Sequence, residues 1–349
     1  MIPAAGDLAA ETARIEDPGD VAARAAHRGG PDTRPVPTIF LGSGSFAVPI
    51  LEALVASPET EIVAIVSAPD RPVGRKAVPT AVPVASRARE LGLPLFQPDR
   101  IRDPAAVASL AALRPAFGVL ADYGQIVPTA VLDLPPRGIL NVHPSLLPRH
   151  RGATPIPAAI LAGDRETGVS LIRMDEGLDT GPIVAVHRWL LDGTETAPEL
   201  EARAAAAGSA LVAATLGPWL RNELIARPQP VEGATLTRPF QREDGRLDPG
   251  RPAAELERQV RALQPWPGTF VDTDAGRIKV LRASVAPVIG TSTAVQPGTF
   301  GPGPGLRLQT TDGDLVLALV QPAGGRVMAG AELVLGRPGL PGSRVAPRP

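Results

Sequence analysis

Hydrophobic residues follow two alternating patterns between residues 38 and 226. Short apolar runs, typical of buried strands, are separated by stretches in which apolar residues recur every three or four positions, as on one face of a helix. The apolar runs are residues 38–41, 61–67, 93–96, 117–121 and 138–142, and the helical stretches are residues 46–55, 84–91 and 103–113. This alternation predicts βαβ units on a doubly wound, mostly parallel sheet of the Rossmann-like α/β class.

The pattern changes in the second half of the chain. Two more apolar runs, residues 169–174 and 183–191, flank an acidic loop that contains glycines and predict a strand pair, and an alanine-rich helix follows at 198–216. Residues 227–252 are rich in proline, glycine and charge, which is typical of a linker. After a helix at 253–263, short strands separated by glycine and proline clusters predict a small OB-like β-barrel, with strands at residues 269–272, 278–285, 306–310 and 315–320.

These patterns divide the chain into four parts. Residues 1–37 lack the basic start and the apolar segment of a secretory signal, and we expect them to form a disordered leader. An α/β domain that we expect to be catalytic covers residues 38–226, the linker covers residues 227–252, and the barrel covers residues 253–349 and ends in a flexible basic tail. No apolar run reaches the length of about 18 residues that a membrane-spanning helix needs, so we expect no membrane partner.

Composition narrows the chemistry. The chain has no cysteine, which excludes disulfides, thiolate nucleophiles and cysteine-bound zinc and favours a cytoplasmic location. The formal net charge of −1 lacks the basic excess that nucleic-acid binders usually carry. Because the first 37 residues hold more acidic than basic side chains, the remaining chain is close to neutral, and its charge weighs only mildly against a nucleic-acid partner.

The apolar run at residues 138–142 ends with two polar residues, Asn141 and His143. Ligands of parallel sheets bind at the carboxyl ends of the strands, and alternate residues of a strand point to the same side. The sequence therefore places an amide donor beside an imidazole. Transfer of a formyl group to an amine needs these two groups, because its tetrahedral intermediate requires a donor for the oxyanion and an acceptor for the amine proton.

A carboxylate near the imidazole would orient it and stabilise its charged form. The acidic loop supplies Asp179, between Gly177 and Gly181, and the rival Asp175, and we favour Asp179. No reactive Ser, Cys or Lys lies in this cluster, which favours direct transfer between two bound substrates. Asn141 and His143 can equally satisfy buried backbone groups at a strand end, so the pattern alone leaves both interpretations open. No His and carboxylate cluster has metal-ligand spacing, and we expect no metal.

Two longer strings carry a family resemblance. Residues 141–152 are NVHPSLLPRHRG, and residues 174–181 are MDEGLDTG. With these strings the chain resembles the folate-dependent formyltransferases over residues 38–328. The resemblance implies that Asn141, His143 and Asp179 are catalytic, and that 10-formyltetrahydrofolate is the formyl donor. It also implies a segment that contacts this reduced folate, made up of Ser145, Leu146, Leu147 and Pro148.

The second half of the chain resembles the branch of the family that formylates methionyl-initiator tRNA. The strings are PWP at residues 265–267 and LVQPAG at residues 319–324. Residues 69–76 resemble the family's inserted loop that reaches the end of the acceptor stem, which implies phosphate contacts from Arg71, Arg75 and Lys76. A solvated surface turn is the alternative for this loop. A second basic stripe that would contact phosphates consists of Arg326, Arg337, Arg344 and Arg348, and a basic solvated tail is the alternative for it. We expect a monomer that binds initiator methionyl-tRNA and a reduced folate.

Proteins with other functions would share part of this pattern. An enzyme that formylates an amino-sugar nucleotide, or one that hydrolyses formyl-tetrahydrofolate, would carry the same catalytic triplet. A protein that only binds tRNA or folate would have no use for His143. Residues 42–47 also fit a relaxed dinucleotide fingerprint after the first strand, which would suggest an NAD(P)-dependent oxidoreductase. The second strand, however, ends without the acidic residue that binds the ribose in such enzymes.

Overall fold

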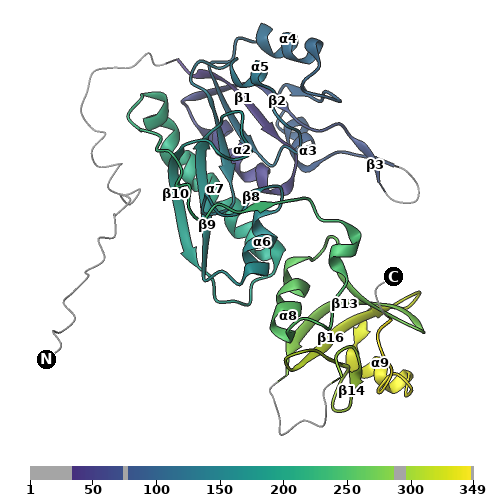
Figure 1. The fold of residues 1–349 in the computed structure, drawn as a ribbon. Helices are drawn as coiled ribbons and strands as arrows, with labels where there is room; N and C mark the ends of the chain where they lie inside the picture. Colours follow the sequence, from purple (N-terminus) through teal and green to yellow (C-terminus); the bar gives the residue numbers. More distant parts are fainter. Residues whose placement is uncertain (1–33, 74–77, 287–295, 347–349) are drawn as a thin grey trace, which may run out of the picture.

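A computed structural model describes residues 34–73, 78–286 and 296–346 of the chain. They form an α/β domain followed by a smaller domain built on an antiparallel sheet (Figure 1). Arg75, Lys76 and Arg348 lie outside the described residues, as does most of the predicted leader. No helix among the residues described is both long and apolar enough to cross a membrane.

The α/β domain is built on a seven-stranded sheet in the order β10-β9-β7-β6-β1-β2-β5. Neighbouring strands from β7 to β5 are parallel, whereas β9 pairs antiparallel with both β7 and β10. The doubly wound, mostly parallel sheet expected from the sequence is therefore confirmed. The bounds are β1 Val36–Gly42, β2 Thr60–Val66, β5 Leu95–Phe96, β6 Phe117–Ala121, β7 Ile139–His143, β9 Glu166–Arg173 and β10 Ile183–Leu190.

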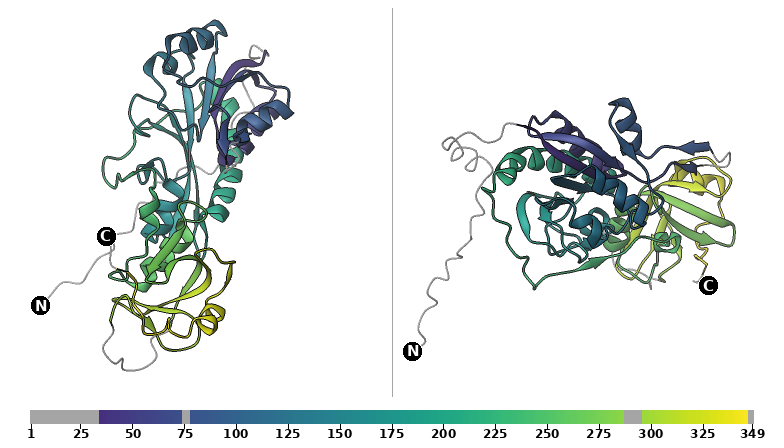
Figure 2. Two further views of the ribbon diagram at one scale, coloured as in Figure 1. Left: turned by 90° about the vertical axis from the view of Figure 1, so that its right-hand side faces the viewer. Right: turned by 90° about the horizontal axis from the view of Figure 1, so that it is seen from above.

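Helices cover both faces of this sheet (Figures 1 and 2). One face packs on α2 Val48–Ala56, α3 Pro83–Glu90, α6 Pro155–Ala162 and α7 Ala197–Leu220, and the other packs on α4 Pro104–Ala112 and α5 Thr129–Leu132. The turn after β1 is a short 3-10 helix, η1 Ser45–Ala47, before α2 begins. Val55, expected on the buried face of α2, is 38% exposed, because the core side of this helix is already formed by Ile50, Leu51 and Leu54.

The segment expected as a proline-rich loop after β2 differs from the expectation. It contains a β-hairpin, formed by β3 Arg71–Val73 and β4 Val78–Thr80, which pair antiparallel. The hairpin projects from the α/β domain on the side where the smaller domain also lies, as the views in Figures 1 and 2 agree.

The C-terminal domain has its own hydrophobic core, which includes Leu256, Ile278, Val280, Phe300, Leu315 and Leu317. Its strands run in the order β12-β13-β16-β15-β14, with β17 on β16, and this antiparallel sheet is consistent with the expected OB-like domain. The bounds are α8 Ala253–Ala262, β12 Thr269–Thr273, β13 Gly276–Val285, β14 Phe300–Gly301, β15 Arg307–Gln309, β16 Asp314–Pro322, β17 Met328–Ala329 and α9 Gly330–Gly336. The two domains touch where Arg258 and Arg261 of α8 donate to the carbonyls of Leu161 and Glu195.

Three expectations about the segments outside the domain cores need correction. The sheet begins at Val36, which pairs with Thr60, so the last two residues of the predicted leader belong to β1. Residues 337–346 are packed instead of forming a flexible tail, because Leu340 is 5% exposed and the Val345 N–H donates to the Gly298 carbonyl. The predicted linker contains η2 Arg242–Gly245 and a strand, β11 Leu236–Thr237, which pairs with β8 Arg151–Gly152 of the α/β domain.

Candidate active site

The end of β7 brings a polar pair to the carboxyl edge of the sheet. Leu140 and Val142 point into the core beneath the α2 and α7 helices. Asn141 and His143, on the opposite face by strand alternation, are 6% and 4% exposed. Polar groups buried to this degree need hydrogen-bond partners, and the partners show how the site is built.

Asp179 lies against both residues. The Asn141 Nδ2 donates to Asp179 Oδ1 at 3.0 Å, and His143 Nδ1 is 3.6 Å from Asp179 Oδ2. The Gly152 N–H donates to the same Oδ2 at 2.7 Å. Asp175, the rival candidate, instead accepts hydrogen bonds from the Gly177 N–H and the Thr180 hydroxyl within its own loop. The fold therefore brings the three expected side chains together and leaves Asp175 to shape the turn.

The other ring nitrogen of His143 determines its tautomer. Nε2 lies 2.9 Å from the backbone carbonyl oxygen of His150, and since a carbonyl can only accept, Nε2 carries a hydrogen. In the neutral ring the lone pair is then on Nδ1, the nitrogen beside Asp179. Burial lowers the pKa of His143, and the negative charge of Asp179 opposes this shift only in part. The ring is thus kept neutral, with its basic nitrogen toward the carboxylate.

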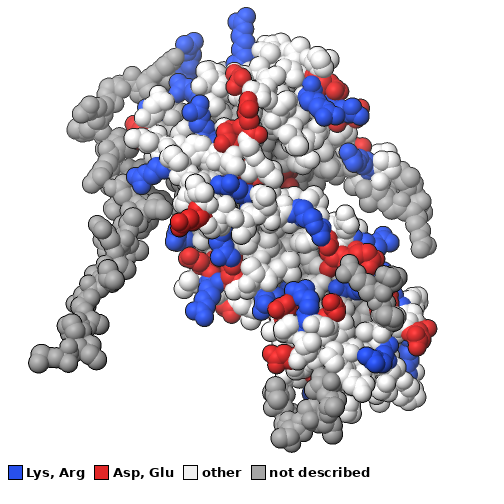
Figure 3. Space-filling model, viewed as in Figure 1, with Lys and Arg blue, Asp and Glu red and all other residues white. Residues whose placement is uncertain are grey.

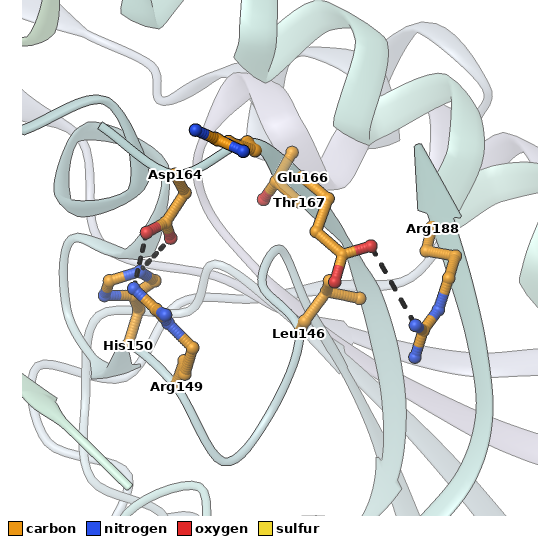
Figure 4. A pocket seen from close by; sticks show the side chains of 8 residues that line it. Leu146, Arg149, His150, Asp164, Glu166, Thr167 and Arg188 are labelled. Carbon is orange, nitrogen blue, oxygen red and sulfur yellow. Dashed lines mark hydrogen bonds and ion pairs between the residues drawn. The ribbon is translucent and has the colours of Figure 1, made fainter. Parts of the chain in front are cut away.

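His150 combines an unusual backbone conformation with a carboxylate partner for its ring. Its backbone has a φ of 57°, in the left-handed region, and its ring Nε2 is 2.7 Å from Asp164 Oδ2. Arg149 also donates to Asp164, and these three side chains line a small charged pocket of about 180 Å³ together with Leu146 (Figure 4). The sequence analysis did not assign His150 or Asp164, and their spacing in the sequence carries no signal for this contact.

The segment from Ser145 to Pro148 is a tightly held loop. Ser145 and Leu147 are buried, and the Ser145 hydroxyl donates to the Arg149 carbonyl at 2.7 Å. The Ser170 hydroxyl donates to the Ser145 carbonyl and accepts from the Leu147 N–H. Only Leu146 and Pro148 are partly exposed, and Leu146 lines the pocket of Figure 4. Ser145 and Leu147 therefore support the loop, and its accessible surface is apolar.

Two exposed apolar residues were missed by the sequence analysis. Ile126, between β6 and α5, is 90% exposed, and Leu178, next to Asp179, is 58% exposed. Their loops meet where the Thr129 hydroxyl donates to Glu176 at 3.0 Å. Isolated exposed apolar residues are common on proteins, but these two stand on adjoining segments, and Leu178 is next to Asp179 in the chain. A ligand with a flat apolar ring could be covered by such a pair.

The turn after β1 is filled by the protein itself. The N–H groups of Ser43 and Gly44 both donate to the carbonyl of Asp122, at 2.9 and 3.4 Å. A Cβ on Gly44 would lie 1.7 Å from the Asp122 carboxylate, so any larger residue there would have to displace that side chain. Burial, followed by the charge of Glu201, raises the pKa of Asp122. A pyrophosphate would need the amides that Asp122 already occupies, which disfavours the dinucleotide-binding alternative.

Of the three residues expected to contact tRNA, the structure describes Arg71 alone. Arg71 is exposed on β3, at the base of the projecting hairpin. In the second basic stripe, Arg326 pairs with Glu332 and Arg344 donates to the Pro297 carbonyl. Positive and negative side chains are interspersed over the face shown in Figure 3. Within the described ranges, no group of three or more His, Asp or Glu side chains could hold a metal ion.

Comparison with known proteins adds a second line of support. The sequence matches the formyl transferase family over residues 36–216 and the C-terminal domain of formyl transferases over residues 239–338. The methionyl-tRNA formyltransferase of Chloroflexus aurantiacus is 43% identical over 302 residues, which is 85% of this chain and 96% of that protein. That of Thermus thermophilus is 43% identical over 306 residues, 88% of this chain and 98% of that protein.

Solved structures show the same fold at lower identity. An N-formyltransferase from Helicobacter canadensis, in complex with folinic acid and dTDP-3-aminofucose, has a TM-score of 0.58 at 15% identity and covers 80% of this chain and 97% of its own. A variant of HypX from Aquifex aeolicus has a TM-score of 0.57 at 15% identity, over 90% of this chain and 50% of its own. These two structures support the fold alone.

Proposed function

The chain belongs to the formyl transferase family, and from this premise we propose that it transfers the formyl group of 10-formyltetrahydrofolate to the free amine of methionyl-initiator tRNA. The observation that carries the proposal is the contact of Asn141, His143 and Asp179 at the end of β7. The nearly full-length similarity to methionyl-tRNA formyltransferases favours this acceptor over an amino sugar, since sugar-directed structures share the fold at much lower identity.

His143 acts as the proton acceptor in this proposal. The amine of the acceptor attacks the formyl carbon, and its proton moves to His143 Nδ1, the nitrogen left basic by the Nε2 contact with His150. The imidazolium that forms is then paired with the Asp179 carboxylate, 3.6 Å away. A depressed pKa suits this role, because the ring remains an acceptor at and somewhat below neutral pH.

Asn141 is the donor for the oxyanion. One of its two amide hydrogens is used by Asp179, which orients the side chain, and the second is left for the oxygen of the tetrahedral intermediate. Collapse of that intermediate returns the electron pair to the departing folate nitrogen, and the proton held by His143 can neutralise it. Proton transfer and charge stabilisation are therefore assigned to neighbouring residues on one strand.

The reduced folate binds beside this strand in the proposal. Exposed Ile126 and Leu178 on adjoining loops offer apolar surface for a flat ring, close to Asp179. Leu146 and Pro148 are the accessible members of the segment implied by the family resemblance, while Ser145 and Leu147 position them. We infer contact through apolar surface here, and not through the Ser145 hydroxyl, which is already bonded.

The acceptor approaches from the side that carries the β3–β4 hairpin and the C-terminal domain (Figure 2). Arg71 lies on β3, and Arg75 and Lys76 follow it in the sequence, so a phosphate-contacting role for the three remains part of the proposal. We infer that the enzyme is a monomer, because the triplet is complete without residues from a second copy. Because charged initiator tRNA is used in the cytoplasm, we infer that the enzyme works there.

The deciding experiment compares acceptors at fixed donor. The protein is incubated with 10-formyltetrahydrofolate and methionyl-initiator tRNA, an amino-sugar nucleotide, or no acceptor, and the formylated product is identified by mass spectrometry. Formyl-methionyl-tRNA as the main product supports the proposal. A formylated sugar, or rapid hydrolysis without an acceptor, would overturn it in favour of the corresponding alternative. Methionyl-tRNA with an acetylated amine serves as the matched control.

A further inference from the structure

The segment between the two domains reaches into the catalytic site. Three of its residues, Gln229, Thr235 and Thr237, make hydrogen bonds to the segments that carry Asp179, His150 and Gly152. By sequence this stretch is a linker rich in proline, glycine and charge, with no chemical role. Its contacts in the fold indicate a different function.

Gln229 forms hydrogen bonds with the backbone of the Asp179 loop. Its Nε2 donates to the carbonyls of Asp179 and Gly181, both at 2.7 Å. Its Oε1 accepts from Nε and Nη2 of Arg151, at 3.1 and 2.7 Å. A glutamine amide has two hydrogens and one oxygen with two lone pairs, so all its capacity is used. If the amide were rotated by half a turn, its oxygen would face the two carbonyl oxygens and its NH2 group would face the Arg151 guanidinium. The hydrogen bonds therefore fix one orientation of the Gln229 amide.

Thr235 supports His143 through His150. The His150 N–H donates to the Thr235 hydroxyl at 2.8 Å, and the Arg151 N–H donates to the Thr235 carbonyl at 2.9 Å. The carbonyl of the same His150 holds His143 Nε2. A short path of hydrogen bonds thus joins the linker to the ring nitrogen that sets the tautomer of His143.

Both points of attachment are strained backbone positions. Asp179 and His150 have φ angles of 53° and 57°, a region that residues other than glycine seldom adopt. Such conformations persist only where surrounding contacts over-determine them, and they gather at functional sites. Gln229 binds one of these residues and Thr235 binds the other.

We propose that Gln229 and Thr235 are positioning residues, through which the interdomain linker holds Asp179 and His143 in the geometry required for formyl transfer. The inference rests on the proposed function and assigns the linker a part in the same site. The residues touch neither substrate: Gln229 sets the place of the Asp179 carboxylate, and Thr235 sets the carbonyl that orients His143. If the linker separates from the α/β domain, the hydrogen bonds of Gln229 and of Thr235 are lost together.

The test uses two variants at each position in the full-length chain. Gln229→Met removes the hydrogen bonds to Arg151 and those to the Asp179 loop. Gln229→Glu keeps the acceptor for Arg151 and loses the donors to the Asp179 loop. We expect both to lower kcat by about tenfold to a hundredfold, with little change in the KM of tRNA, because small misplacements of reacting groups have effects of this size. Thr235→Val should lower kcat similarly, and Thr235→Ser should restore it by returning the hydroxyl.

The matched control is Gln259→Met. Gln259 of α8 also donates its amide to two backbone carbonyls, those of Asp244 and Arg246, but it is buried in the C-terminal domain, whereas Asp179 belongs to the α/β domain. This variant should lose thermal stability and keep kcat. Thermal unfolding of all the variants separates a loss of fold from a loss of positioning.

A second measurement does not depend on turnover. The charged groups that act on His143 are Asp179, which raises its pKa, and His150, which lowers it. If Gln229→Met releases Asp179, the pKa of His143 falls further, and NMR titration of the ring will show protonation at lower pH than in the parent. The chain has only four histidines, which keeps the assignment tractable.

The outcomes are distinguishable. Folded Gln229 variants with parental kcat and an unchanged His143 titration would overturn the inference, while tRNA formylation by the parent would still support the proposed function. A parent that does not formylate methionyl-tRNA would overturn the proposed function, and the NMR titration would still decide whether Gln229 positions Asp179.

Discussion

The end of β7 and the β3–β4 hairpin are both assigned to substrates, yet the fold holds them very differently. Asn141 and His143 are almost fully buried, and each has an identified partner within the protein. Arg71 lies exposed on a short strand that pairs only with its own return strand. The proposed catalytic groups are thus held by the core of the protein, whereas the proposed acceptor-binding element stands away from it. Changes at β7 should affect turnover, and changes in the hairpin should affect binding.

The largest effect is expected from His143→Ala. Loss of the proton acceptor should lower kcat by about a hundredfold to ten-thousandfold, the range typical of general bases. Single-turnover formylation with saturating donor and tRNA measures the chemical step directly. His187→Ala is the matched control, since this exposed histidine on β10 contacts Trp189 and lies outside the triplet. Equal rates for the two variants would mean that His143 is not the proton acceptor and that the end of β7 does not control turnover.

The next effect concerns the pH dependence of Asp179→Asn. The pKa of His143 is lowered by burial and partly raised by Asp179, so removing this charge should lower it further. Because the neutral ring is the active form, the acid limb of the kcat/KM profile should move to lower pH in the variant. The plateau itself should drop by about a hundredfold, since the imidazolium loses its partner.

The direction of this shift sharpens the comparison. In the parent, the acid limb should already lie below 6.5, the ordinary pKa of histidine. An acid limb that stays in place in Asp179→Asn, or moves to higher pH, would mean that Asp179 does not act on His143 in solution. The profile should be recorded with the KM of tRNA measured at each pH, so that titration of the acceptor is separated from titration of the enzyme.

The smallest effect is expected from Arg71→Ala. Removing one phosphate contact should raise the KM of tRNA by roughly threefold to tenfold and lower the salt slope by about 1, with no change in kcat. The KM of the folate donor should not change. Arg188→Ala on the edge strand β10 also removes an exposed arginine and serves as the control. The same KM of tRNA in both variants would mean that Arg71 does not contact tRNA and that the hairpin is an ordinary surface turn.

Much of the fold followed from local pattern, and the failures have identifiable physical causes. Apolar periodicity located the strands of the main sheet, because strand and helix spacing are properties of neighbouring residues. It missed β8 and β11, which have two residues each and exist only as a pair formed by segments distant in the chain. It also treated residues 71–80 as a loop, since prolines conceal a short hairpin at the edge of the domain.

The candidate site shows the same division. By itself the sequence placed Asn141 and His143 on one face of a strand end and supplied two aspartates in a nearby loop. Only the tertiary structure placed the Asp179 carboxylate against both residues, oriented His143 through His150, and brought Gln229 of the linker onto the Asp179 loop. The contacts of Asp179 with Asn141 and with Gln229 join residues 38 and 50 positions apart in the chain, at 3.0 and 2.7 Å. Hydrophobic periodicity depends on residues that are close in the chain, whereas such contacts depend on how complete helices and strands pack. For this reason the sequence predicted which residue types belong to the site, but not which of them hydrogen-bond to one another.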